Sequence, residues 1–154
     1  MSEEKTVVSN RKARHEYEIV DQVEAGLVLL GSEVKSLRAG RANLGDAYAR
    51  VIKGEVWVIG MHISPYKEAT FENHEPLRDR KLLLHRSEIK KLARRVDEKG
   101  FTLIPLRLYF LRNIVKLELG IARGKRQYDK KVAIAQKDAK REMEREQKKF
   151  KFKI

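Results

Sequence analysis

The sequence of 154 residues has no cysteine, only 3 prolines and only 1 tryptophan. Without cysteine there can be no disulfide, no thiolate nucleophile and no cysteine-based zinc site. No apolar run approaches the roughly 20 residues that a membrane-spanning helix needs. Residues 1–8 contain Glu3 and Glu4 and lack the apolar core of a signal peptide. We therefore expect a cytoplasmic protein.

Catalytic motifs are also missing. There is no HExxH and no G-x-S-x-G, and no metal-binding spacing relates His15, His62, His74 and His85. Segment 120–125 (GIARGK) has the wrong glycine spacing for the phosphate loop GxxxxGK[ST]. We expect no enzymatic activity, no catalytic residues, no metal and no other cofactor.

Basic residues are in clear excess. The chain has 35 Lys and Arg against 22 Asp and Glu, a formal net charge of +13, and its pI is about 10.0. This balance indicates a polyanionic partner, with nucleic acid as the first candidate and an anionic membrane as the second. Residues 123–154 carry a net charge of +8, and residues 1–122 carry the remaining +5.

The charge distribution predicts three segments: a mobile N-terminus at 1–9, a binding body at 10–123 and a basic tail at 124–154. From Asp129 onward the tail has neither Gly nor Pro, so its composition suits a helix. Its apolar stripe is mostly alanine, which buries too little surface to hold the helix on the body. We expect the tail to be mobile alone and helical on a phosphate-rich surface. Alanine also anchors poorly in a membrane, so we expect no membrane partner.

Two short helices are predicted. The first runs over 32–39, from Ser32 as N-cap to Gly40 as stop, and its exposed edge would carry Lys35, Arg38 and Arg41. The second begins at the cap Ser87 and ends at Gly100, with an apolar stripe at i, i+3, i+4 and i+7.

Alternating patterns predict several strands. Residues 17–30 read as extended with a kink at Ala25-Gly26, and 46–52 and 55–63 form a hairpin around Lys53-Gly54. Residues 64–79 read as a long loop. The clearest strands place Ile104, Leu106, Leu108 and Phe110 on one face, then Val115, Leu117, Leu119 and Ile121, with Pro105 at a sheet edge or bulge. This pattern predicts a mainly β fold, a small antiparallel OB-like barrel with two or three flanking helices.

Candidate nucleic-acid contacts cluster near the N-terminus. Cations that meet phosphates alternate with rings that stack on bases, at Arg11, Lys12, Arg14, His15 and Tyr17. The alternative is a solvated entry to the first strand. The basic edge with Lys35 and Arg38 is weaker, because such edges are often only solvated.

Several blocks in series resemble the small protein B family, the SsrA-binding proteins of trans-translation. They are NRKARHEY (10–17), EAGLVLLGSEVKSLRAGRANLGDAYA (24–49), LRDRKLLLHRSEIKKL (77–92), LIPLRLYF (103–110) and GIARGKRQYDKK (120–131). The resemblance implies an OB-type barrel that binds the tRNA-like domain of transfer-messenger RNA and delivers it to stalled ribosomes. The body would lie in the decoding centre and the tail in the empty mRNA channel, in contact with ribosomal RNA, so that nascent chains are tagged and ribosomes freed.

The resemblance also implies individual site residues. RNA contacts on the body would include Asn10, Arg11, Lys12, Glu24, Leu83 and Lys116. Ribosome contacts would come from Gly124, Lys125, Arg126, Tyr128, Asp129, Lys130 and Lys131, and basic residues further along the tail, Lys137, Arg141 and Arg145, would line its helix. The family commonly ends this motif in DKR, whereas this chain has Asp129-Lys130-Lys131; lysine keeps the charge and loses the bidentate geometry of arginine.

Glu24 is the unusual member of a phosphate-binding set. It would accept hydrogen bonds from base edges or 2′-hydroxyls, or hold a neighbouring arginine, or be a purely structural acid. For the whole chain, the competing interpretations are a general OB-type RNA-binding or ribosomal protein and an RNA-processing enzyme. We expect no small-molecule substrate.

Overall fold

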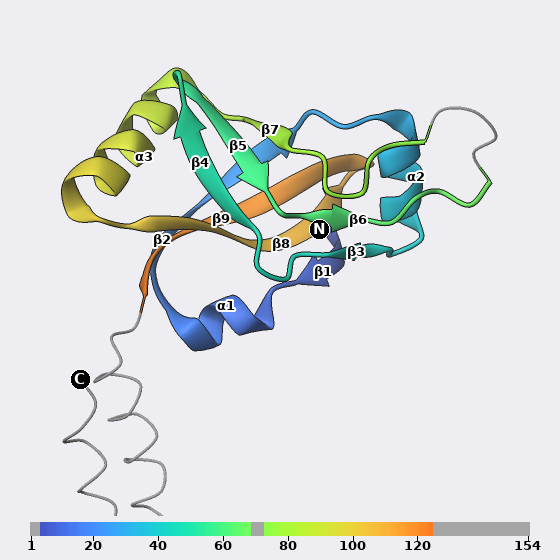
Figure 1. Cartoon of the computed structure of the whole chain (residues 1–154), viewed down its shortest axis with the longest axis horizontal. Helices are drawn as coiled ribbons and strands as arrows, with labels where there is room; N and C mark the ends of the chain where they lie inside the picture. The colour runs from blue at the N-terminus through green and yellow to red at the C-terminus, as the bar shows by residue number, and fades with distance from the viewer. Residues whose placement is uncertain (1–3, 69–72, 125–154) are drawn as a thin grey trace, which may run out of the picture.

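The computed structural model describes residues 4–68 and 73–124 (Figure 1). Along the chain the elements are β1 (Glu4–Ser9), α1 (Arg11–Glu16), β2 (Tyr17–Leu27), α2 (Gly31–Arg38), β3 (Ala42–Asn43), β4 (Tyr48–Ile52), β5 (Glu55–Ile59), β6 (His62–Ile63), β7 (Arg80–Leu83), α3 (Arg86–Lys99), β8 (Thr102–Leu111) and β9 (Ile114–Gly124). No helix within these ranges is long and apolar enough to cross a bilayer.

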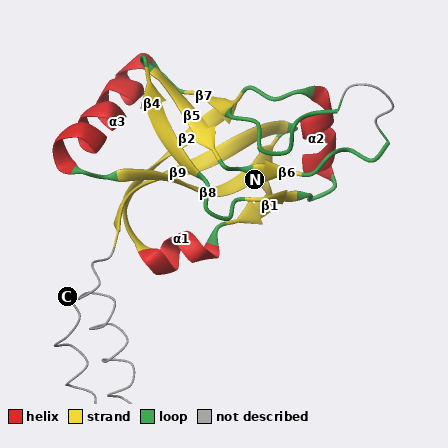
Figure 2. Ribbon diagram, viewed as in Figure 1, coloured by secondary structure: helices red, strands yellow, loops and turns green. Residues whose placement is uncertain are grey.

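The main sheet closes on itself. Its strand order is β1-β8-β4-β5-β7-β2-β9, and a further pairing joins β8 to β9. Strands β8, β4, β5, β7, β2 and β9 therefore form a ring with antiparallel neighbours, and β1 adds to the outside of β8. The helices α1, α2 and α3 lie on three different sides of this ring (Figure 2). The expected mainly β, OB-like architecture is confirmed.

The barrel interior is filled by alternate side chains of its strands. Val115, Leu117, Leu119 and Ile121 all point into it, as their alternation predicts. The hairpin at Lys53-Gly54 is also confirmed, with φ values of 50° and 78° that suit a tight two-residue turn.

The N-terminal segment differs from the expectation. Residues 1–9 were expected to be mobile, but Glu4–Ser9 form β1, which pairs with β8 from Leu111 back to Arg107. Val7 and Val8 pack against the core. The contacts of Val7 and Val8 with the core therefore hold this otherwise polar segment in place beside β8.

The expected common face of Ile104, Leu106, Leu108 and Phe110 is wrong, because a register shift lies between Pro105 and Arg107. This bulge was predicted from Pro105. Beyond it, the side chains that point into the barrel and those that point outward change places. Leu108 points into the barrel, whereas Ile104 and Leu106 point outward and pack with Ala13 of α1. This part of β8 is apolar on both of its faces, because α1 covers the outer face. Leu106 then lies over Gly120, where an added Cβ would come within 2.9 Å of its side chain.

The predicted kink in β2 is also displaced. The register between β2 and β9 shifts between Ile19 and Asp21 rather than at Ala25-Gly26. Gly26 instead lies between two partners, because it is opposite Lys116 of β9 on one side and Leu83 of β7 on the other.

The helix starts are two residues earlier than expected. Leu30, not Ser32, precedes α2, and the Glu33 carboxylate accepts its backbone N–H at 2.8 Å. His85, not Ser87, precedes α3, and Glu88 accepts its N–H at 2.9 Å. In both helices a glutamate at the third position satisfies a free donor of the first turn. The ends agree with the prediction, since Gly40 and Gly100 have φ values of 73° and 71°.

Candidate nucleic-acid interface

Asn10 fixes the position of α1 on the barrel. Its side-chain carbonyl accepts the N–H of Ala13 at 3.1 Å, its amide donates to the carbonyl of Pro105 at 3.0 Å, and its backbone N–H donates to Leu106 at 2.8 Å. Only 6% of the residue is exposed. Asn10 is one of the residues expected to contact RNA, and the hydrogen bonds of its side chain hold the start of α1 against β8.

Helix α1 presents those cations to solvent. Arg11, Lys12, Arg14 and His15 are all exposed. Lys12 pairs with Asp46 at 2.7 Å, and the hydrogen bond and the charge of Asp46 raise the pKa of Lys12. Such exposed pairs are weak, so a phosphate can replace the carboxylate at little cost. The basic patch expected from the sequence is therefore exposed on α1.

Tyr17 begins β2 directly after α1 and is opposite Gly124, the last residue of β9. An added Cβ at Gly124 would lie 3.9 Å from the Tyr17 ring. Two predicted site residues from the two ends of the sequence are thus adjacent. A cavity of about 230 Å3 between α1 and the turn before β4 is bordered by Lys12, Tyr17 and Tyr48.

Glu24 and Lys116 come together on the outer face of the barrel. Glu24 is opposite Glu118 in β9, while Lys116 is opposite Tyr109 in β8. The hydroxyl of Tyr109 donates a short hydrogen bond to the Glu24 carboxylate. Burial and the negative charge of Glu24 both raise the pKa of Tyr109. Glu24 is thus held by a tyrosine and keeps acceptor capacity toward solvent.

Arg107 links this pair to α1. Its guanidinium stacks 4.0 Å from the centre of the Tyr109 ring and lies 3.5 Å from the Glu118 carboxylate. Glu118 is in turn 3.8 Å from Arg14. We call Arg14, Glu24, Arg107, Tyr109 and Glu118 the outer-face network. Its ion pairs hold charges of both signs in fixed positions over the Tyr109 ring, which is buried.

Sequence reasoning did not single out Arg107 and Tyr109. The signal was present, because alternation from Leu108 into the barrel places both neighbours on the opposite face. Tyr109 is only 2% exposed, so its ring supports Arg107 and its hydroxyl holds Glu24.

Leu83 lies at the far end of the same surface. It is 51% exposed, and Ile114 nearby is 60% exposed. Together with Lys116 they border a cavity of about 360 Å3 at one end of the barrel. Gly26 also borders this cavity, and a Cβ there would be in van der Waals contact with Leu83, 3.4 Å from its Cβ. Glu24, Leu83 and Lys116, which are far apart in the sequence, therefore surround one strand junction.

Lys35 and Arg38 lie on α2, on a different side of the barrel from α1 (Figure 1). Both are exposed, and Lys35 is 5.5 Å from the centre of the Tyr66 ring. The expected basic edge is present.

Helix α2 is held in place by a buried acid. Glu33 is fully buried and accepts hydrogen bonds from Arg80 at 2.7 Å and from Arg78 at 2.8 Å. Burial alone would raise the pKa of Glu33, but the bonds from Arg78, the Leu30 N–H and Arg80 outweigh it and lower that pKa. Arg80 also donates to the carbonyls of Met61 and Pro76. This buried cluster fixes the basic edge against the loop before β7.

In the two described ranges no group of three or more His, Asp or Glu side chains could hold a metal ion. His74 instead bridges the Ser32 hydroxyl at 2.9 Å and the Ile63 carbonyl at 2.8 Å. Of the predicted tail contacts only Gly124 is within the described residues. The others lie outside: Lys125, Arg126, Tyr128, Asp129, Lys130, Lys131, Lys137, Arg141 and Arg145.

Fold and surface together define a basic OB-like barrel with exposed cations on its outer side, a type of protein that binds nucleic acid. A family model described as SmpB protein matches residues 7–149. This chain belongs to the SmpB protein family.

Close relatives extend over nearly the whole chain. The SsrA-binding protein of Acetivibrio thermocellus is 57% identical over 143 residues, which cover 93% of each chain. That of Symbiobacterium thermophilum is 59% identical over 140 residues, which cover 90% of this chain and 89% of the relative. A solved structure described as "tmRNA-SmpB: a journey to the center of the bacterial ribosome" is similar with a TM-score of 0.68 and 46% identity, over 82% of this chain and 93% of the other.

Proposed function

We propose that this chain is an RNA-binding adaptor of trans-translation, which binds the tRNA-like domain of transfer-messenger RNA and brings it to stalled ribosomes. Membership of the SmpB family, whose relatives are named SsrA-binding proteins, is the observation that carries this proposal. The adaptor acts in the cytoplasm by binding, and its chemistry needs neither turnover nor a cofactor.

The described surface suits a folded RNA. Exposed cations on α1 bind phosphates, and the exposed Glu24 carboxylate of the outer-face network accepts hydrogen bonds from base edges or 2′-hydroxyls. The exposed Leu83 beside Lys116 gives an apolar contact to an unstacked base. Because these groups sit on a closed barrel, their spacing is set before RNA arrives, and shape can be recognised at little entropic cost.

The basic tail at 124–154 completes the proposal. It enters the mRNA channel only when the channel is empty, because an mRNA already there excludes it by volume and charge. Tail residues such as Lys137, Arg141 and Arg145 then meet the phosphates of ribosomal RNA.

A binding competition tests the RNA preference. Transfer-messenger RNA, ordinary tRNA and a generic duplex of equal length compete for the full chain at raised salt, where nonspecific attraction is weakened. We expect transfer-messenger RNA to be bound most tightly. If the generic duplex competes equally well, the chain is a general OB-type RNA-binding protein and not an adaptor for transfer-messenger RNA. RNA cleavage in the same mixtures with Mg²⁺ would indicate an enzyme instead.

Truncation after Gly124 separates the two roles. We expect the truncated chain to bind transfer-messenger RNA normally and to fail in tagging on stalled ribosomes. Loss of RNA binding on truncation would contradict this assignment of roles.

A further inference from the structure

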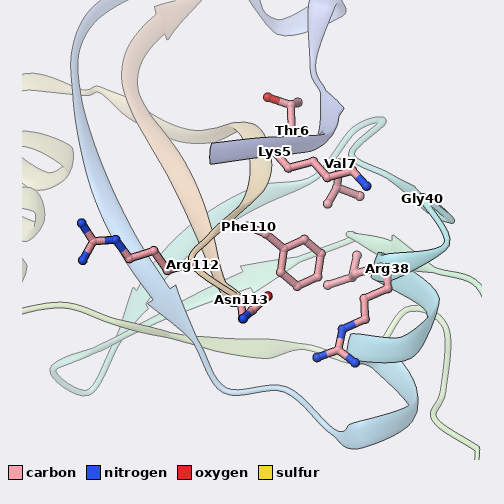
Figure 3. A pocket seen from close by; sticks show the side chains of 9 residues that line it. Lys5, Thr6, Val7, Arg38, Gly40, Phe110, Arg112 and Asn113 are labelled. Carbon is pink, nitrogen blue, oxygen red and sulfur yellow. The ribbon is translucent and has the colours of Figure 1, made fainter. Parts of the chain in front are cut away.

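A further concave site lies at one end of the barrel, on the side of α2 (Figure 3). It is a cavity of about 520 Å3 between β1, the end of α2 and the β8–β9 turn, within the range of about 300–1,000 Å3 that is usual for small-ligand sites. The residues that matter for its chemistry are Lys5, Val7, Leu37, Arg38, Phe110 and Asn113. None belongs to the outer-face network, and only Arg38 was expected from the sequence.

The first observation is the pairing of a lysine with an aromatic ring. Lys5 of β1 is directly opposite Phe110 of β8, so both side chains leave the same side of the sheet. Phe110 is half-buried, packed against the core on one side and open to the cavity on the other. In Figure 3 the ring lies between the side chains of Lys5 and Arg38.

The second observation is uncompensated charge. Among the described residues neither Lys5 nor Arg38 has an acidic partner within ion-pair distance, although Lys12, Arg78, Arg80, Arg95 and Arg107 all do. Arg112 also borders the cavity, but its guanidinium points away from the ring (Figure 3). Two unpaired cations therefore flank one apolar ring.

The remaining walls fit a heterocyclic base. Val7 and Leu37 supply apolar surface, and the side-chain amide of Asn113 lies beside the ring (Figure 3). An amide offers one acceptor and two donor hydrogens, which can bond to the edge of a base. The carbonyls of Lys35, Ser36 and Leu37 near the end of α2 accept the N–H groups of Ala39, Gly40 and Arg41.

We propose that this cavity binds one unstacked nucleotide of the RNA partner, with its base on Phe110 and its phosphate between Lys5 and Arg38. The inference rests on the RNA-binding function proposed above and adds a site to it. Neighbouring phosphates of the strand then meet Lys35 and Arg41, which line an adjoining cavity together with Arg38 and Tyr66. Base-on-ring stacking between cations is the usual way in which proteins hold single-stranded RNA.

Photo-crosslinking locates the base directly. Phe110→p-azidophenylalanine keeps the ring and places a reactive group at the cavity. The full chain is irradiated with two RNAs, the tRNA-like domain of transfer-messenger RNA and a hairpin with an unpaired loop. We expect crosslinks confined to one unpaired nucleotide of each RNA. Bound RNA without crosslinks, or crosslinks spread over paired regions, would overturn the proposal.

Charge-matched variants test the phosphate contact. K5Q/R38Q removes two cations at the cavity, and K90Q/R94Q removes two exposed cations from α3, away from every site described above. We expect K5Q/R38Q to weaken binding of the tRNA-like domain about tenfold, and to weaken binding of a fully paired duplex no more than K90Q/R94Q does. Equal effects of the two double variants on both RNAs would mean that Lys5 only protects the open edge of β1.

The two proposals can fail separately. If the wild-type chain shows no preference for the tRNA-like domain, the adaptor function fails, yet crosslinks to the hairpin loop still support the cavity as a nucleotide site. If the preference is strong and the crosslinks are absent, the cavity proposal fails and the adaptor function stands.

Discussion

Two ionic clusters of similar composition occupy very different places in this molecule. Around Glu33, two arginines meet one carboxylate in the interior, and Arg80 and Glu33 have side chains that are 0% exposed. Around Arg107, the outer-face network combines arginines and glutamates on the surface, where the exposed fractions of Arg107 and Glu118 are 23% and 21%.

The difference shows how location decides the use of the same residue types. Inside, Arg80 and Glu33 are paired with each other and hydrogen-bonded to further groups, because an unpaired buried charge is costly. The buried cluster therefore ties α2, the loop before β7 and β7 together. On the surface, solvent weakens each pair, so the same groups can exchange their partners for RNA.

Glu33→Gln should cause the largest loss of stability. The amide cannot balance Arg80, which stays buried, and we expect the free energy of unfolding to fall by about 3 kcal/mol. Denaturant unfolding followed by circular dichroism measures this. The control is Glu55→Gln, which removes an exposed pair with Lys81 of similar length, 2.9 Å. Equal destabilisation by the two variants would contradict the contrast between buried and exposed clusters.

Acid should reduce the contribution of the same cluster. The folded pKa of Glu33 is lowered from the ordinary 4.5, so the ionised form stabilises the fold above that pH. The contribution is lost as the pH falls through the folded pKa. We expect the difference in unfolding midpoint between wild type and Glu33→Gln to shrink from about pH 7 to about pH 3. If the difference in unfolding midpoint stayed constant over this range, packing and not the charge of Glu33 would account for the stabilisation.

Arg11→Gln combined with Lys12→Gln should leave the unfolding midpoint unchanged and weaken RNA binding. Both side chains are exposed, and the fold does not depend on them. If each meets one phosphate, the slope of log affinity against log salt should become shallower by about 2. Titrations of the tRNA-like domain at several salt concentrations measure the slope, with K90Q/R94Q as the matched control. A slope unchanged from wild type would remove α1 from the interface.

Tyr109→Phe should lower the free energy of unfolding by about 1 kcal/mol, because it removes one hydrogen bond. It also frees the Glu24 carboxylate from its fixed position, so RNA affinity should fall by a few fold. Because the pKa of Tyr109 is raised, its contribution is complete below the ordinary value of 10.0 and is lost as the pH rises further. Absorbance titration should show an ionisation above the ordinary 10.0 in the wild type that is missing from Tyr109→Phe. Unchanged affinity would make Glu24 a structural acid.

The strongest sequence predictions are those carried by local chemistry. The Lys53-Gly54 turn, the glycine helix stops and the inward alternation of β9 all follow from backbone preferences and a period of two. The bulge at Pro105 was predictable for the same reason, but its consequence was not. Which face Leu106 takes depends on α1, a distant segment that covers the outer sheet.

The residues of the candidate site also divide into those that the sequence could predict and those that it could not. The cations of α1 and α2 could be named from sequence because exposure is the default for lysine and arginine. The structural role of Asn10 and the bond between Tyr109 and Glu24 could not, because their partners are 95 and 85 residues away. The cavity between Lys5 and Phe110 likewise requires the pairing of β1 with β8, which nothing near either residue signals.

Composition, charge and strand periodicity by themselves determined a basic, mainly β protein without cysteine chemistry, because these properties belong to each residue or its nearest neighbours. The tertiary structure alone decided which charges are buried and which are free to meet RNA. Burial depends on closure of the barrel, which brings β8 and β9 together with strands from the other end of the chain. The same arginine stabilises the fold in a dry interior and can contact RNA on a wet surface.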